Sequence, residues 1–258
     1  MIAKLIRQAS ALAVAERKRL GLGSEPIVDI RALVEQQGAL VYATSIPNGA
    51  LSGCFALIGE DAWIMVNSAS TVGRQRFTIA HEYCHSLAHR DLGFIVCTAE
   101  KPPHERFADA FAAVFLMPLE SGETYFASDI VAGRSITAER VIEYCYAYGV
   151  SYVAAVYRLH NLGLFNAGQR DTLLAVQPIR LASSMGHDVS DPRGPFFQQQ
   201  GLSGQPEDAL PRAYRSAAVR AYEEERISEA KLAELLRVDV DDLDSVLDPE
   251  EPIEVPVV

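Results

Sequence analysis

The sequence predicts an α+β protein in which a small antiparallel three-stranded sheet packs on two helices, followed by a mainly helical C-terminal region. Two observations predict this class. Between residues 39 and 67, β-branched and aromatic residues form short runs separated by turn residues, which is typical of strands. On both sides of that segment, apolar residues recur every three or four positions, which indicates amphipathic helices.

Residues 1–125 are expected to form one domain that contains the sheet. Its first helix ends at Gly21-Leu22-Gly23, and Gly59-Glu60-Asp61 marks the turn between the second and third strands. Pro118 interrupts the last helical pattern of the domain. The predicted elements, in order, are helices 1–20 and 29–35, strands 40–42, 53–58 and 63–66, and helices 74–90 and 103–118.

Three further segments follow this domain. Residues 126–182 are predicted to be a helical unit with a helix-turn-helix pattern around Gly149. Residues 183–210 are rich in Ser, Gly, Pro and Gln, which is typical of a linker or mobile loop. Residues 211–258 are predicted to be an acidic, helical C-terminal region, which acts either as a docking element or lid, or as an amphipathic cover for its own core.

The charge distribution argues against nucleic-acid and membrane partners. The formal net charge is -11, and residues 221–258 carry 13 acidic and 3 basic residues, so the rest of the chain is close to neutral. A protein that binds phosphates needs a basic surface. In the helical unit, Arg140 and its neighbouring arginines are balanced by glutamates, so we favour packing against the first domain over DNA reading there.

The chain is expected to work in the cytoplasm with reduced cysteines. Four cysteines are too few for a disulfide scaffold in a chain of 258 residues, and none forms a C-x-x-C motif. Lys4, Arg7 and Glu16 interrupt the apolar residues at the start, so that segment fits neither a signal peptide nor a membrane span.

The most specific motif is His81-Glu82-Tyr83-Cys84-His85, inside a predicted helix. Histidines four residues apart lie on one face of a helix and can offer two imidazole nitrogens to one zinc ion. Glu82, beside that face, is the predicted general base, which takes a proton from the attacking water and passes it to the leaving amine. The alternative is a pair of histidines that bind no metal.

A catalytic zinc site needs a third protein ligand, and we assign it to Glu105 on the next helix. Asp109, one turn later, is expected to accept the other ring N–H of a zinc-bound histidine, preferably His81. The alternative is that both carboxylates lie on the solvated face of an amphipathic helix. His89 is expected beside the ligands at the helix end, and His104 at an exposed helix start. Cys84, turned about 100° from the ligand face, is expected in the core.

In these motifs the chain resembles the ImmA/IrrE-type metallopeptidases, a gluzincin-like family with an HExxH motif. The resemblance covers about residues 1–125. It rests on Leu51-Ser52-Gly53, the run 63–67, the run Arg76 to His89, and Glu105 to Pro118. It implies one zinc ion held by His81, His85 and Glu105, with Glu82 as general base. Tyr83-Cys84 departs from the family, which often has a small Gly before the second His.

The resemblance also implies a substrate: a partner transcriptional repressor with a helix-turn-helix head, whose site-specific cleavage switches on stress or mobile-element genes. Two alternatives remain. The first alternative to a peptidase is a zinc-containing binding module that captures an antitoxin or repressor without cutting it. The second is a DNA-binding regulator, which the charge of the chain argues against. His and carboxylate ligands also accept manganese, iron or cobalt, and the sequence does not decide whether the chain self-associates.

Overall fold

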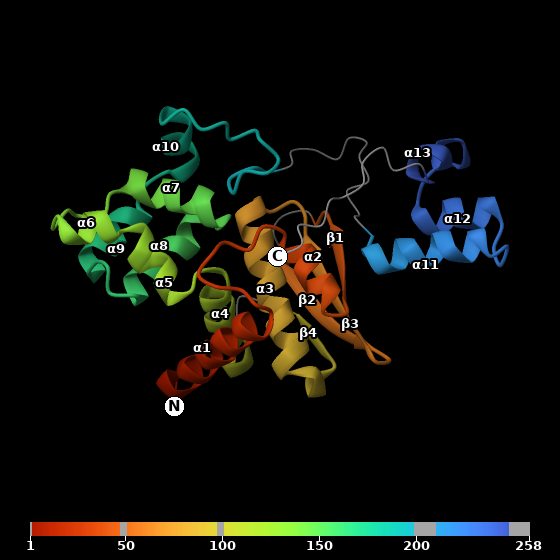
Figure 1. The fold of residues 1–258 in the computed structure, drawn as a ribbon, viewed down its shortest axis with the longest axis horizontal. Helices are drawn as coiled ribbons and strands as arrows, with labels where there is room; N and C mark the ends of the chain where they lie inside the picture. The colour runs from red at the N-terminus through yellow and green to blue at the C-terminus, as the bar shows by residue number, and fades with distance from the viewer. Residues whose placement is uncertain (1, 47–50, 97–100, 199–209, 248–258) are drawn as a thin grey trace.

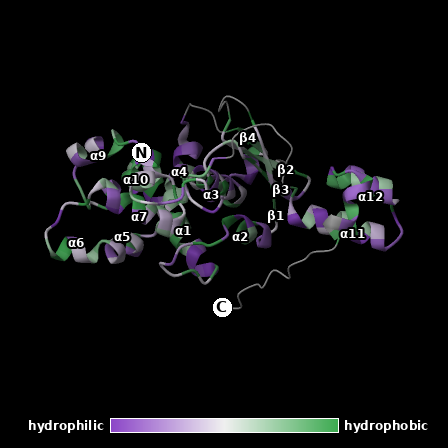
Figure 2. Ribbon diagram, turned by 90° about the horizontal axis from the view of Figure 1, so that it is seen from above, coloured by the Kyte–Doolittle hydropathy of each residue, from purple (hydrophilic) through white to green (hydrophobic). Residues whose placement is uncertain are grey.

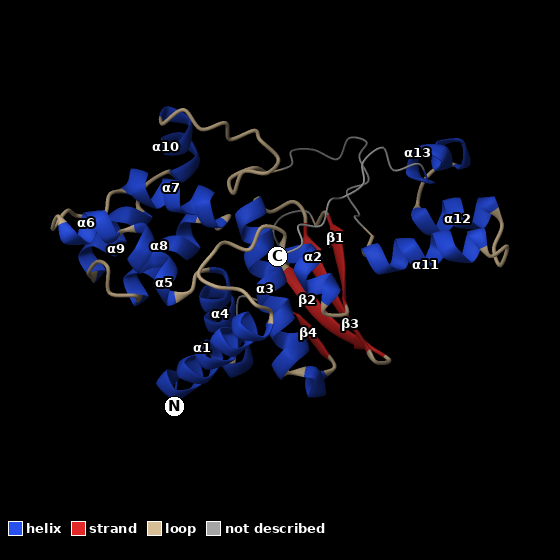
Figure 3. Ribbon diagram, in the orientation of Figure 1, coloured by secondary structure: helices blue, strands red, loops and turns tan. Residues whose placement is uncertain are grey.

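The computed structural model describes residues 2–46, 51–96, 101–198 and 210–247, and it has the predicted α+β class (Figure 1, Figure 3). The sheet-bearing half contains α1 (Ile2–Arg19), α2 (Ile30–Gln36), β1 (Ala39–Thr44), β2 (Gly53–Ile58), β3 (Asp61–Asn67), α3 (Val72–Ala88), the 3-10 turn η2 (Arg90–Leu92), β4 (Phe94–Val96) and α4 (Pro103–Leu116). A helical part follows with α5 (Leu119–Tyr125), α6 (Ala127–Val131), α7 (Ala138–Tyr148), α8 (Tyr152–Asn161), α9 (Ala167–Leu174) and α10 (Pro178–Ser184). The last elements are α11 (Arg212–Glu223), α12 (Glu229–Leu236), η3 (Val240–Asp242) and α13 (Leu243–Leu247).

The prediction of three antiparallel strands is wrong in two respects. The sheet has four strands in the order β1-β3-β2-β4, and β1 runs parallel to β3, with Val41 opposite Ile64. The β2–β3 hairpin is antiparallel as predicted, because the turn after Ile58 is a local signal. Neither the insertion of β3 beside β1 nor the three-residue strand β4 leaves such a signal in the sequence.

One face of the sheet is covered by α3, and α4 and α1 pack behind it (Figure 1). Alternate strand residues point toward these helices: Val41, Ile64 and Phe55 are fully buried, and Ile95 is 5% exposed. The sheet therefore serves as a rigid support for α3, the helix that carries the two motif histidines.

Helix α1 is held against α4 by a buried arginine. The guanidinium of Arg17 donates to the carbonyl oxygens of Phe115, Gly23 and Glu25, at 2.6 Å for Phe115 and 2.8 Å for Glu25. Burial lowers the pKa of Arg17, but these acceptors satisfy its donors. One side chain thus connects α1, the following loop and the C-terminal end of α4.

The helical part α5–α10 shares its core with the sheet-bearing half, since one continuous cluster of buried apolar residues extends from Ala9 to Phe196. Within it, α7 ends at Gly149, whose φ of +62° suits glycine, and Ser151 caps α8 by accepting a hydrogen bond from the amide of Ala154. Residues 195–198 lie within the segment predicted as a linker or loop. They hydrogen bond to the start of α3, for example through the carbonyl of Pro195 and the amide of Gly73.

Helices α11–α13 form a separate small core, centred on Leu232 and Leu243, and lie beyond the sheet in Figure 1 and Figure 2. They contact α2 and β1 through arginines: Arg212 pairs with Asp29, the N-cap of α2, and Arg237 donates to the hydroxyl of Tyr42 on β1. Among the described helices, none is both long and apolar enough to cross a bilayer.

The close approach at Gly73 generates a stability prediction. A Cβ atom there would lie 2.6 Å from the amide nitrogen of Ser151 and 2.7 Å from the carbonyl carbon of Val150, and neither backbone atom can move freely. Gly73→Ala should lower the free energy of unfolding by about 1–3 kcal/mol in urea denaturation. Gly23→Ala is the matched control, since no atom lies within 4 Å of a Cβ there. Equal stability of the two variants would contradict this packing.

Candidate metal centre

Helix α3 presents His81 and His85 on one face, toward α4, while Ile79, Tyr83 and Cys84 pack into the core. Tyr83 fixes this rotation: its hydroxyl donates to the carboxylate of Glu16 on α1, which also binds Arg19. His81 is 3% exposed and His85 is fully buried. Their Nε2 atoms lie 3.2 Å apart, as expected for two histidines separated by about one helical turn.

Glu105, at the start of α4, completes a group of three buried donors. Its Oε2 lies 3.3 Å from Nε2 of His81, and its Oε1 lies 3.3 Å from Nε2 of His85. Ligand atoms around a tetrahedral zinc ion, with bonds of about 2.0–2.1 Å, are about 3.3–3.4 Å apart. The three residues therefore fit a divalent cation, and they form the candidate metal group among the described residues.

Asp109 lies one turn beyond Glu105 and contacts the far side of the His81 ring. Its Oδ1 is 3.0 Å from Nδ1 of His81, and its Oδ2 is 2.9 Å from Nζ of Lys101. When Asp109 accepts a hydrogen bond from Nδ1–H of neutral His81, Nε2 of His81 carries the free lone pair that a metal requires. This is the contact expected for Asp109, whereas Lys101 has no signal in the sequence that points to the site.

His89 and His104 extend the cluster on the other side. Nδ1 of His85 lies 2.9 Å from Nδ1 of His89, so His85 can donate there and keep its Nε2 free for a cation. Nε2 of His104, on a side chain that is one third exposed, is 3.8 Å from Glu105 Oε1. Four of the six histidines in the chain thus gather at this place, with His89 beside the ligands as predicted.

Glu82 is fully buried and lies against the beginning of β2. A Cβ atom on Gly53 would be 3.0 Å from Glu82 Oε1 and 2.4 Å from Cγ2 of Thr78, so only glycine allows β2 to approach α3 here. Cys84, two residues after Glu82, is buried in the core as expected. Burial together with the charge of Glu82 raises the pKa of the Cys84 thiol. Cys97 lies outside the described residues.

The carboxylates determine the protonation of the histidines. Burial acts to lower the pKa of His81, but hydrogen bonds to Asp109 and Glu105 and the charge of Glu82 together raise it to about 9. The pKa of His85 is lowered, chiefly by burial and also by the charge of His81. Burial and its histidine neighbours lower the pKa of His89 to about 4. At pH 7, His81 is therefore the protonated member of the ligand group, and His85 is neutral.

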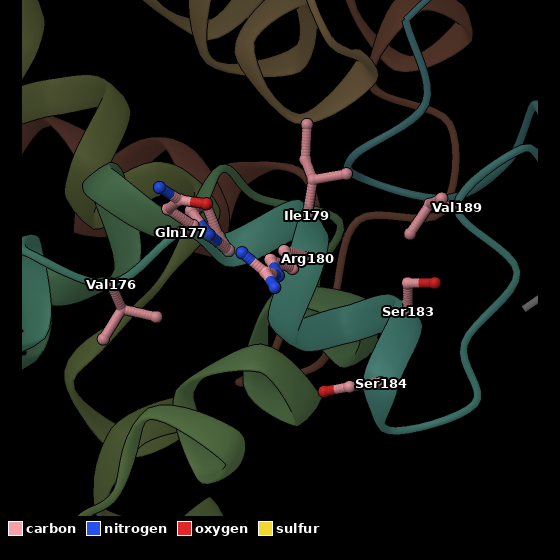
Figure 4. Close-up of a pocket in the computed structure, with 8 residues that line it drawn as sticks. Val176, Gln177, Ile179, Arg180, Ser183, Ser184 and Val189 are labelled. Atoms are coloured by element: carbon pink, nitrogen blue, oxygen red, sulfur yellow. The ribbon is translucent and has the colours of Figure 1, made fainter.

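A separate hollow of about 730 Å³ lies beside α10, away from this group (Figure 4). Its lining includes Val176, Ile179, Arg180 and Val189, and no histidine or carboxylate side chain is among the lining residues. The hollow therefore has none of the groups that a metal-dependent reaction needs.

Part of the chain is similar to a known protein family. The family model of the Peptidase M78 family, described as the IrrE N-terminal-like domain, matches residues 34–160. This match confirms the resemblance to the ImmA/IrrE family. It begins in α2 and extends into α8, and so includes the sheet, the helices α3 and α4 that carry His81, His85 and Glu105, and most of the α7–α8 pair. No curated protein matches the chain.

The pKa of His81 predicts a proton release. Because a metal ligand must be unprotonated, a cation that binds below pH 9 displaces the His81 proton, whereas His85 has none to lose at pH 7. Calorimetric titration of chelator-treated protein with zinc, in buffers of different ionisation enthalpy, should give a release of about one proton near pH 7 that disappears above pH 10. Affinity should rise with pH up to about 9. A release that is the same at pH 7 and pH 10 would contradict the assignment.

The Asp109 contact predicts a loss of metal affinity without loss of fold. Asp109→Asn removes the negative charge that orients His81 and should weaken zinc binding by about 10- to 100-fold in competition with a fluorescent chelator. Asp171→Asn, an exposed carboxylate change on α9, is the control. Unchanged affinity in Asp109→Asn would show that the contact does not support the ligand.

Proposed function

Since residues 34–160 belong to the Peptidase M78 family, we propose that the chain is a zinc-dependent endopeptidase that cuts one partner protein at a specific bond. The partner we propose is a helix-turn-helix transcriptional repressor in the cytoplasm, whose cleavage turns on stress or mobile-element genes. Family membership supports the peptidase activity. The choice of a repressor rests on the resemblance to the ImmA/IrrE proteins.

The observation that carries the proposal is the buried Glu82 next to three converging donors. His81, His85 and Glu105 would hold the cation, which when bound supplies Lewis-acid polarisation of a carbonyl and of a water molecule. Glu82 follows His81 directly in α3, about 1.5 Å farther along the helix axis. Its charge acts on His81, so its carboxylate is close to the first proposed ligand. The position of this carboxylate suits a general base for the attacking water.

In the proposed reaction, Glu82 first accepts a proton from the water that attacks the peptide carbonyl carbon. It then donates this proton to the nitrogen of the leaving amine as the C–N bond breaks, so the carboxylate ends as it began. Asp109 keeps the His81 ring oriented throughout, and Lys101 keeps Asp109 in place. Because Glu82 is shielded from bulk water, its proton is transferred within the site.

The substrate is proposed to bind as an added strand beside β4. This strand is at the edge of the sheet, and Phe94 and Val96 on it are 62% and 37% exposed. Its neighbour β2 brings the Phe55 ring to 6.4 Å from the ring of His85. A peptide hydrogen-bonded along β4 would therefore have its backbone close to the ligand group.

The proposal predicts that Glu82→Gln abolishes cleavage. The amide keeps the shape of the side chain but cannot take a proton, so the cleavage rate should fall by about 100- to 10,000-fold. Bound zinc should stay near one per chain by elemental mass spectrometry. Glu123→Gln, an exposed change on α5, should cleave as the unchanged protein does. Cleavage can be followed on candidate repressors by mass spectrometry.

The same variant separates the peptidase from a binding module. If the unchanged protein captures a repressor and leaves it intact, and Glu82→Gln behaves identically, the peptidase proposal is wrong. If only Glu82→Gln retains an intact repressor in a stable complex, the proposal stands.

A further inference from the structure

Arg74 lies on α3, on the same helix face as Glu82. Positions 74, 78 and 82 are spaced four residues apart, so the three side chains form one row along the helix. The row begins at an exposed residue, Arg74, and continues through two buried ones, Thr78 and Glu82. A rise of 1.5 Å per residue places Arg74 about 12 Å from Glu82 along the helix axis.

The segment before β2 lies against this row. Ser52 Oγ accepts a hydrogen bond of 2.8 Å from Nη2 of Arg74, and the next residue, Gly53, approaches Thr78 and Glu82. The guanidinium is thus held at the beginning of β2, at the end of the sheet beyond the point where β4 pairs with Cys54. A peptide that extends along β4 toward that end would pass near Arg74.

The charge of Arg74 has no acidic partner in the described part of the chain. No carboxylate of the described residues lies within 4.0 Å of its guanidinium, and the hydrogen bond to Ser52 uses one of its five N–H donors. An anchored guanidinium with free donors favours a carboxylate, which it can bind with two parallel hydrogen bonds.

We propose that Arg74 is a specificity-determining residue that binds an acidic side chain of the substrate, three or four residues from the bond that is cut. The distance follows from the row: about 12 Å corresponds to three or four residues of an extended strand at about 3.3 Å each. This inference rests on the proposed peptidase function, because it takes Glu82 as the position of the reacting bond. It defines the substrate class as a protein segment with Asp or Glu at that spacing.

The effect is expected in the specificity constant. An exposed ion pair usually contributes little to binding free energy, but a bidentate pair with a positioned guanidinium contributes more. We therefore expect an acidic residue at the proposed position to raise kcat/KM by about 3- to 10-fold. Arg74→Lys keeps the positive charge but cannot form two parallel hydrogen bonds with a carboxylate, so it should retain part of the preference for an acidic residue. Arg74→Glu should reverse it toward Lys or Arg.

The test uses the full zinc-loaded chain and a mixture of degenerate peptides, with cut sites read by mass spectrometry. The expected result is enrichment of Asp and Glu at one position, three or four residues from the cut bond, and replacement by Lys and Arg in Arg74→Glu. Arg90→Gln, an exposed arginine beyond the other end of α3, is the control and should keep the acidic preference. Cleavage without any acidic preference, or a preference that survives in Arg74→Glu, overturns the inference.

A binding measurement separates failure of this inference from failure of the peptidase proposal. Fluorescently labelled peptides that contain one Glu or, at the same position, one Gln are titrated against the Glu82→Gln protein, so this measurement needs no turnover and no known cut site. Tighter binding of the Glu peptide that is lost on adding Arg74→Glu supports the inference even if the unchanged protein cuts nothing. Equal binding of both peptides overturns it even if the unchanged protein is an active peptidase. Arg74→Gln repeats the comparison should Arg74→Glu fail to fold.

Discussion

The convergence of two imidazole nitrogens and one carboxylate inside the core, with the nitrogens 3.2 Å apart and each 3.3 Å from a carboxylate oxygen, is the constraint on which the rest of the structure depends. Imidazoles and a carboxylate are costly to bury unless each is paired. The chain supplies these pairs in series: Lys101 binds Asp109, Asp109 binds His81, Glu105 contacts both ligand histidines, and His89 contacts His85. Polar side chains on two helices are thus compensated by one another, with one lysine at the surface end.

Such a cluster requires that α3 and α4 keep their relative position to within a fraction of an ångström. Two buried contacts from α1 provide this: Glu16 holds Tyr83 on α3, and Arg17 holds the carbonyl of Phe115 on α4. These are adjacent residues of one helix, each bound to a different helix of the site. The first helix, although it carries no ligand, therefore acts as the clamp of the metal group.

The parts of the site that could be predicted from the sequence are those determined by helical spacing. His81 and His85, and Glu105 and Asp109, are each one turn apart, and this alone places each pair on one face. The structure brings the two faces together. The roles of Lys101 and Gly53 could not be predicted in the same way, because each role depends on a contact with a different element. Lys101 contacts Asp109 on α4, and Gly53 on β2 packs against α3. The parallel pairing of β1 with β3 was missed for the same reason, since strand order is set by long-range packing rather than by local turns.

The two edges of the sheet differ in a way that bears on where a peptide can bind. At the β1 edge, Arg31 donates to the carbonyl of Val41 at 2.8 Å and also to the carbonyl of Leu210, and α11 lies against the strand. A backbone acceptor of β1 is therefore already in use, and the C-terminal helices cover this side (Figure 1).

The β4 edge lies on the side of β2 and the metal group, with Phe94 exposed. An open edge invites pairing with another strand, so a protein normally covers it unless it has a use for it. Among the described strands, β4 pairs with β2 alone, so its outer edge is the one that the proposed substrate strand would use.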